Sequence, residues 1–284
     1  MRFTESSEAV DWYEASHDAM IAAVSQAAAL GWHAEVWRLA FALRTFLRIR
    51  RQTDDWIATS GLGLAAARSL DDPDAERRLC ESMSGAYLQA GRFSDCVEVA
   101  TRAVALAEAL GDAPAAARSR HLCGIAHDRL GHRLQAEREL AAALADEAYA
   151  ASPDAMLGWV SIGAIYGGQG RYDECRPALH NALRLATEVN DEQALCVIHH
   201  NLAELALLTG EPSAGADHAR QEISIARRLR FALREARGNE MLADCLSDND
   251  PGGASQAWRR AIEIYDLIDP RLGDSARERL AQAG

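Results

Sequence analysis

Apolar residues recur along the chain with the spacing of an α-helix, three or four positions apart. Val97, Ala100 and Val104 follow this period, as do Leu140 and Leu144. On a helix, residues at this spacing lie on one face, which can pack against a neighbour. No stretch alternates between apolar and polar residues as a half-buried strand would. The pattern therefore predicts an all-α protein.

Glycine separates the helical segments at a nearly constant interval. Gly91, Gly131, Gly170 and Gly210 lie 40, 39 and 40 residues apart, each between two Ala-rich segments. Small residues also recur seven positions before these glycines, where two helices would have to touch. A helix-turn-helix unit cannot bury its apolar face alone, so neighbouring units must stack into a solenoid. A binding scaffold is therefore the first functional expectation.

Residues that cap helix N-termini mark the boundaries between units. Asp72, Asp112, Ser152 and Asp191 stand there, three of them with proline at or near the first helical position. We expect one elongated domain over residues 1–284, with a leading helix at about 7–29 and a short closing helix near 271–282. The six helix hairpins between them are predicted at about 33–70, 73–110, 113–149, 153–189, 191–229 and 232–268.

The repeated unit resembles the tetratricopeptide repeat, which places a bulky residue, then Leu-Gly, then Tyr on its first helix and a small residue on its second. Ser84 replaces the glycine of this pattern in one unit and His127 replaces its tyrosine in another. The resemblance implies a right-handed superhelical solenoid of antiparallel helix hairpins, with helices about one turn longer than usual, since the period is near 40. The best match is Trp159-x-x-Ile162-Gly163-x-x-Tyr166-x-x-x-Gly170-Arg171-Tyr172-x-x-Cys175.

A narrower resemblance rests on the leading segment, residues 3–15 and 20–24. This segment is similar to the start of the C-terminal tetratricopeptide region in actinobacterial transcriptional regulators of the AfsR type, in the STAND class of signal-transduction ATPases. Such regulators join a DNA-binding domain, a nucleotide-binding switch and a repeat sensor. The resemblance implies the sensor alone, because the chain has neither a GxxxxGK[ST] motif nor any lysine. An attached or separate ATPase and DNA-binding domain is then an expected partner.

Charge and composition narrow the range of partners. The net charge is −12, and all 30 basic residues are arginine. A negative surface repels a phosphate backbone, so we expect no direct nucleic-acid contact. The N-terminus lacks the apolar region of a signal peptide, and no apolar run approaches the roughly 18 residues that span a bilayer. We therefore expect a cytoplasmic protein without membrane contact.

The chain offers little that favours catalysis, a cofactor or a metal. Its six cysteines are spread singly, without a CxxC pair, as expected of reduced thiols that fill a core. The densest group of potential metal ligands is His121, Cys123, His127 and His132. On a helix, residues 121 and 127 point about 240° apart, which does not suit one metal site. We expect no enzyme, cofactor or metal.

The candidate binding residues follow from the resemblance, because first helices line the concave face of such solenoids. Arginine binds carboxylates through two parallel hydrogen bonds, and asparagine can pair with a peptide backbone. The groove is therefore expected to receive an acidic or C-terminal peptide, or an acidic face of a partner domain. The alternative is that the arginines form solvated pairs with neighbouring carboxylates. The exposed positions hold Arg38, Arg48, Arg78, Glu81, Gln89, Arg118, His121, Asp128, Arg129, Ser161, His200, Asn201 and Glu204.

Two functions remain open on the sequence. The first is a regulatory module whose groove binds a protein or peptide and biases a transcription switch. The second is a standalone scaffold that brings partner proteins together.

Overall fold

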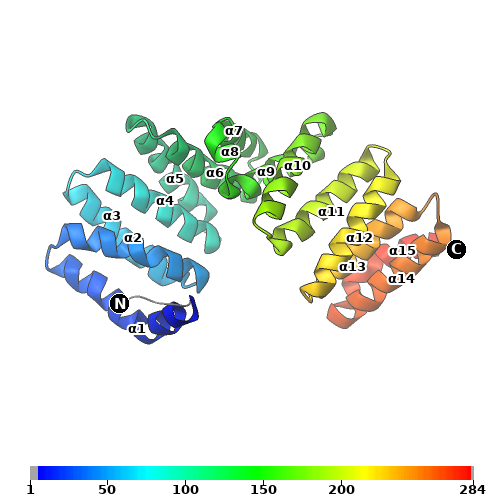
Figure 1. Ribbon diagram of the computed structural model, residues 1–284, viewed down its shortest axis with the longest axis horizontal. Coiled ribbons are helices and arrows are strands. Elements are labelled where there is room, and N and C mark those ends of the chain that lie inside the picture. Colours follow the sequence, from blue (N-terminus) through cyan, green and yellow to red (C-terminus); the bar gives the residue numbers. More distant parts are fainter. Residues whose placement is uncertain (1–5, 283–284) are drawn as a thin grey trace. The chain divides into compact units, whose positions relative to one another are not determined.

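The computed structural model describes residues 6–282, and their side chains from Trp12 onward. Every regular element in this range is a helix, and the range contains no strand (Figure 1). The all-α prediction is confirmed. The first helix, α1 (Ser6–Ala29), confirms the predicted leading helix. Residues 3–5 of the leading segment lie outside the described residues.

Backbone contacts divide the chain into two compact units, Met1–Ala150 and Ala151–Gly284, called unit 1 and unit 2 below. That the whole chain acts as one domain stays a prediction. Unit 1 continues after α1 with α2 (His33–Ile49), α3 (Thr53–Ser69), α4 (Pro73–Gln89), α5 (Phe93–Ala109), α6 (Ala113–Arg129), α7 (Arg133–Leu144) and α8 (Glu147–Ala150). Unit 2 contains η1 (Pro153–Ala155), α9 (Met156–Gly168), α10 (Tyr172–Glu188), α11 (Glu192–Leu208), α12 (Pro212–Arg228), α13 (Ala232–Leu246), α14 (Pro251–Ile268), η2 (Pro270–Gly273) and α15 (Asp274–Gln282).

The 40-residue period arises from helices of 17 residues joined by turns of three. The helix α4 ends before Gly91, whose φ of +75° is the left-handed conformation that favours glycine. The next amide, that of Arg92, donates to the carbonyl of Tyr87 at 2.9 Å. This bond belongs to the Schellman motif, which satisfies the last carbonyls of a helix. The recurring glycines therefore end helices, and the next helix begins two residues after each of them.

Aspartate begins several of the following helices, as predicted. The side chains of Asp72, Asp112 and Asp191 each accept a hydrogen bond from the backbone N–H three residues further on, at 3.0 Å. Ser152 was expected to act in the same way, and this prediction is wrong. It precedes the 3-10 turn η1 and makes no capping bond to it.

The predicted hairpin 113–149 is interrupted in its second helix. The helix α7 ends at Leu144, and the short helix α8 follows after two residues. The side chain of Asp146 accepts a hydrogen bond from the amide of Tyr149 at 2.7 Å and so starts a new turn. This local cap replaces the continuous helix that the apolar spacing predicted.

Small residues lie where helices meet, as expected. A Cβ atom added to Gly163 of α9 would lie 2.8 Å from Cδ2 of Leu179 in α10, closer than side chains pack. The first helices of successive hairpins also contact one another: α2, α4 and α6 in unit 1, and α9, α11 and α13 in unit 2. Each unit therefore has a layer of first helices.

The cysteines take part in the core. All six are free and buried, which confirms the expectation for their packing. Burial raises the pKa of the Cys80 thiol to about 11, so this thiol is unreactive at neutral pH. None of the helices in the described part of the chain combines the length and apolarity that crossing a lipid bilayer requires.

Candidate peptide-binding surface

The layer of first helices in unit 1 brings several predicted residues side by side. The guanidinium of Arg118 in α6 lies 3.2 Å from the carboxylate of Glu81 in α4. The helix α4 also reaches α2, since Gln89 donates to the carbonyl of Arg48 at 3.1 Å. These bonds join three helices along one face. We call this face the arginine surface, defined by Phe41, Arg44, Arg48, Arg78, Glu81 and Arg118.

An aromatic ring supports two guanidinium groups on the arginine surface. Arg44 lies over the ring of Phe41, 3.7 Å from its centroid, and donates to the Phe41 carbonyl at 2.8 Å. Arg78 approaches the same ring at 5.8 Å. Burial lowers the pKa of Arg44, and the nearby charges of Arg48 and Arg78 lower it further, against an opposing effect of Glu81. Arginine nevertheless remains charged, so two positive charges lie beside this ring, and Arg48 lies close enough to affect the first of them.

Two carboxylates neutralise part of this charge. Asp74 lies 2.7 Å from both Arg77 and Arg78, and Glu81 lies 3.3 Å from Arg77. Arg77 is only 4% exposed and ties the two acids together, while Arg118 shares Glu81 with it. The alternative prediction of paired arginines therefore applies to Arg78 and Arg118.

Other arginines of unit 1 lack such partners. Among the described residues, no carboxylate lies within ion-pair distance of Arg44 or Arg48, nor of Arg38 or Arg129. Arg38 instead lies 5.5 Å from the ring of Trp37. The arginine surface thus carries excess positive charge on an acidic chain, and Arg44 and Arg48 provide the guanidinium groups that remain available.

His121 does not join this surface. The prediction placed it on the concave face, but the residue is 8% exposed. Its ring packs edge-on against Tyr149, with centroids 6.0 Å apart. The interruption after α7 is the reason, because α8 packs against α6 and covers this position.

Of the remaining candidates, Asp128 on α6 and Ser161 on α9 are half-buried, and three others lie on α11 of unit 2. Asn201 is half-buried and Glu204 is exposed. His200 contacts a buried acid, because its Nδ1 lies 2.9 Å from the carboxylate of Glu222, a fully buried residue of α12. Sequence reasoning did not identify this partner. Nor did it identify Phe41 and Arg44, although Phe41, Arg44 and Arg48 share one helix face by their spacing.

Histidines also meet in pairs. Nδ1 of His127 lies 3.3 Å from Nδ1 of His132, and the corresponding atoms of His199 and His218 are 3.1 Å apart. Among the described side chains, no three His, Cys, Asp or Glu residues are grouped so that they could hold a metal ion.

Comparison with known proteins agrees with this architecture. The sequence profile of the tetratricopeptide repeat matches residues 154–228, in unit 2. No curated protein sequence matches the chain.

Solved structures resemble the chain over most of its length. The apo form of RapI has a TM-score of 0.59 and 13% identity, over 82% of this chain and 84% of that one. Aspartyl phosphate phosphatase F from Bacillus subtilis has a TM-score of 0.61 and 13% identity, over 91% and 70%. A Rap protein complexed with Competence and Sporulation Factor has a TM-score of 0.58 and 11% identity, over 87% and 74%. At such identities the likeness concerns the fold, and the fold of this chain is that of a tetratricopeptide-repeat protein.

Proposed function

We propose that this chain is a protein- or peptide-binding module whose arginine surface captures an acidic segment of its partner. The observation that carries the proposal is that Arg44, which lies over the ring of Phe41, and Arg48, whose charge acts on Arg44, have no carboxylate within ion-pair distance among the described residues. Solenoids use extended surfaces of this kind for binding. A partner carboxylate would find two guanidinium groups and an apolar ring at one place.

We further propose that binding serves regulation, as in the sensor of a transcriptional regulator. The similarity of the leading segment to regulators of the AfsR type supports this role. One of the similar structures is a Rap protein complexed with Competence and Sporulation Factor, so a protein of this fold can hold such a factor. An immunoblot of a native lysate separates this role from that of a standalone scaffold. A product several times larger than 30.8 kDa favours the sensor, and one of that mass favours the scaffold.

The binding site is tested with an array of synthetic acidic peptides and matched peptides in which Asn and Gln replace Asp and Glu. We expect the chain to prefer the acidic peptides, and Arg44→Gln with Arg48→Gln to weaken that preference. The matched control is Arg138→Gln, since the Arg138 side chain is 83% exposed in the same unit and lies outside the arginine surface. Equal binding of acidic and neutral peptides by the unaltered chain would exclude the arginine surface as the site.

A further inference from the structure

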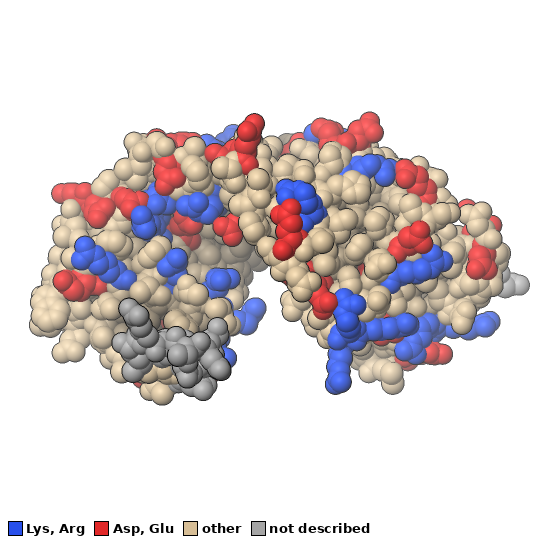
Figure 2. All heavy atoms as spheres, viewed as in Figure 1, with Lys and Arg blue, Asp and Glu red and all other residues tan. Residues whose placement is uncertain are grey.

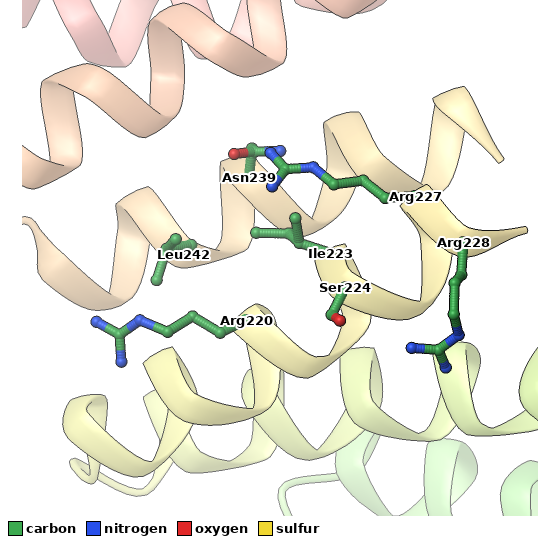
Figure 3. Close-up of a pocket in the computed structure, with 7 residues that line it drawn as sticks. All are labelled: Arg220, Ile223, Ser224, Arg227, Arg228, Asn239 and Leu242. Carbon is green, nitrogen blue, oxygen red and sulfur yellow. The ribbon is translucent and has the colours of Figure 1, made fainter. Parts of the chain in front are cut away.

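Unit 2 contains a groove between α12 and α13 that is separate from the arginine surface. Its volume is about 700 Å³, and three of its lining residues are arginine while none is acidic. Residues 220, 223, 224 and 227 lie on one side of α12, because seven residues make two helical turns. The lining residues, drawn in Figure 3, are Arg220, Ile223, Ser224, Arg227, Arg228, Asn239 and Leu242.

The groove lies in a basic stretch of an acidic chain. Residues 220–237 contain six arginines and only two glutamates. One of these, Glu222, is fully buried and bonded to His200. Figure 2 shows basic side chains gathered over α12 and α13. The local charge is therefore opposite in sign to that of the whole protein.

Each arginine of the groove has a carboxylate partner that an incoming acidic segment would replace. Arg220 pairs with Asp217 at 2.8 Å, and the two side chains are 54% and 79% exposed. A pair this exposed is readily exchanged for another carboxylate. Arg227 shares the carboxylate of Glu235 with Arg260, at 2.9 and 3.4 Å, and Arg260 also pairs with Glu263 at 3.1 Å. Arg228 pairs with Glu192 at 2.7 Å.

An asparagine indicates which kind of anion fits. Asn239 is 5% exposed, and its Nδ2 donates to the carbonyl of Glu235 at 2.7 Å. Its Oδ1 receives no hydrogen bond from the described residues and is therefore available as an acceptor. A peptide can supply both an N–H for this oxygen and a carboxylate for Arg227, whereas a phosphate group has no N–H to donate.

The distance between the two ends of the groove determines which spacing of acidic residues in a peptide fits it. Figure 3 shows Arg227 beside Asn239 at one end and Arg220 beside Leu242 at the other, with Ile223 between them. Seven helical residues place the Cα atoms of Arg220 and Arg227 about 10 Å apart. In an extended polyproline II chain, residues i and i+3 point to the same side about 9 Å apart. Two acidic residues at this interval can therefore meet both arginines.

We propose that this groove binds an extended acidic segment of a partner protein, with acidic residues at i and i+3 and an apolar residue between them. The acidic side chains pair with Arg220 and Arg227, a backbone N–H of the segment donates to Asn239, and the apolar side chain packs on Ile223 and Leu242. This interaction surface adds to the proposed function and uses none of the residues of the arginine surface. A negative result for one surface therefore does not affect the proposal for the other.

The test measures fluorescence anisotropy of a labelled peptide, Gly-Glu-Leu-Ala-Glu-Gly amide, titrated with the full chain. Arg220→Gln with Arg227→Gln is expected to weaken binding about tenfold or more, as is replacement of both peptide glutamates by glutamine. Ser224→Glu is a second variant, which adds a negative charge in the groove at an exposed residue without removing a native ion pair. The matched control is Arg184→Gln on α10, because Arg184 and its partner Glu188 are similarly exposed.

Each outcome of the titration either supports or overturns the proposal. Loss of binding in both groove variants, with unchanged binding by the control, supports the proposal. The proposal is overturned if both variants bind as tightly as the unaltered chain, or if no binding occurs at about 1 mM, which corresponds to only ~4 kcal/mol. Binding of inorganic phosphate in place of the peptide also overturns it, because the groove is then a simple oxyanion site.

Discussion

Nδ1 of His200 lies 2.9 Å from Oε2 of Glu222, a carboxylate that is fully buried in unit 2. The other oxygen, Oε1, is also buried and receives no hydrogen bond from the described residues. A carboxylate oxygen only accepts, so Nδ1 of His200 donates in this pair. His200 is therefore a structural partner of Glu222 in addition to being a candidate binding residue.

Removal of the His200 ring should lower the free energy of unfolding of unit 2 by more than is usual for a partly exposed side chain. The change His200→Leu leaves Glu222 buried without its partner, which typically costs about 3 kcal/mol in the free energy of unfolding. Urea denaturation followed by circular dichroism measures the effect. The neighbouring change Asn201→Ala is the control, and an equal loss in both variants would contradict the structural role of the pair.

Acid should weaken unit 2 through His199. Burial lowers the pKa of this imidazole from 6.5 to about 4, and His218 lowers it further. The folded chain therefore holds His199 neutral, so its contribution is complete above pH 6.5 and is lost as the pH falls toward 4. Because the ring is partly exposed, we expect a loss of about 1 kcal/mol at pH 5.

The comparison of melting temperatures at pH 7.5 and pH 5 checks this effect. The change His199→Phe should reduce the difference between the two temperatures, whereas His33→Ala in unit 1 should leave it unchanged. A difference that persists fully in His199→Phe would assign the acid sensitivity to other groups.

Gly163 should not tolerate a methyl group. Alanine there brings Cβ to 2.8 Å from Leu179, so the helices α9 and α10 must separate. We expect destabilisation by about 1–3 kcal/mol from overpacking, against a gain of about 1 kcal/mol in helix propensity. Gly168→Ala in the same helix is the matched control, because no heavy atom lies within 4 Å of its added Cβ. In thermal denaturation, Gly163→Ala should melt at a lower temperature than the unaltered chain and Gly168→Ala at a higher one. A higher melting temperature for Gly163→Ala would show that the helices separate without cost.

Glu76 should stabilise unit 1 at neutral pH. Its carboxylate lies 3.0 Å from Arg68 and 3.1 Å from Arg102, and its side chain is 10% exposed. The hydrogen bond from Arg102 and that from Arg68 hold the pKa of Glu76 below its usual 4.5, despite the opposing effect of burial. The stabilisation is therefore present above pH 4.5 and is lost as the pH falls through the lowered pKa.

The change Glu76→Gln should lower the free energy of unfolding by about 1–2 kcal/mol at pH 7 and by less at pH 4. Urea midpoints at the two pH values measure this difference. The exposed Glu35→Gln on α2 is the control, and an unchanged midpoint in Glu76→Gln would show that the arginines find other partners.

The positions of the helices follow from local features of the sequence. Gly91 can adopt the left-handed conformation that ends a helix, and Asp112 can cap the helix that follows it, whatever the rest of the chain does. These signals act over three to five residues, so a single sequence displays them. The error at Ser152 is also local, because the proline after it begins a 3-10 turn before the helix.

The binding surfaces depend on contacts between distant residues. Arg44 occupies the repeat position that holds the small residues Ser84 and Gly124 in the next units. Only the structure shows Arg44 over the Phe41 ring, with no carboxylate of the described residues within ion-pair distance. Likewise, nothing in its spacing distinguishes Glu222 from the other residues of α12, and its burial depends on packing against α11 and α13. The sequence alone sets helix ends through local hydrogen bonds, whereas tertiary packing decides which charges are paired, buried or left available.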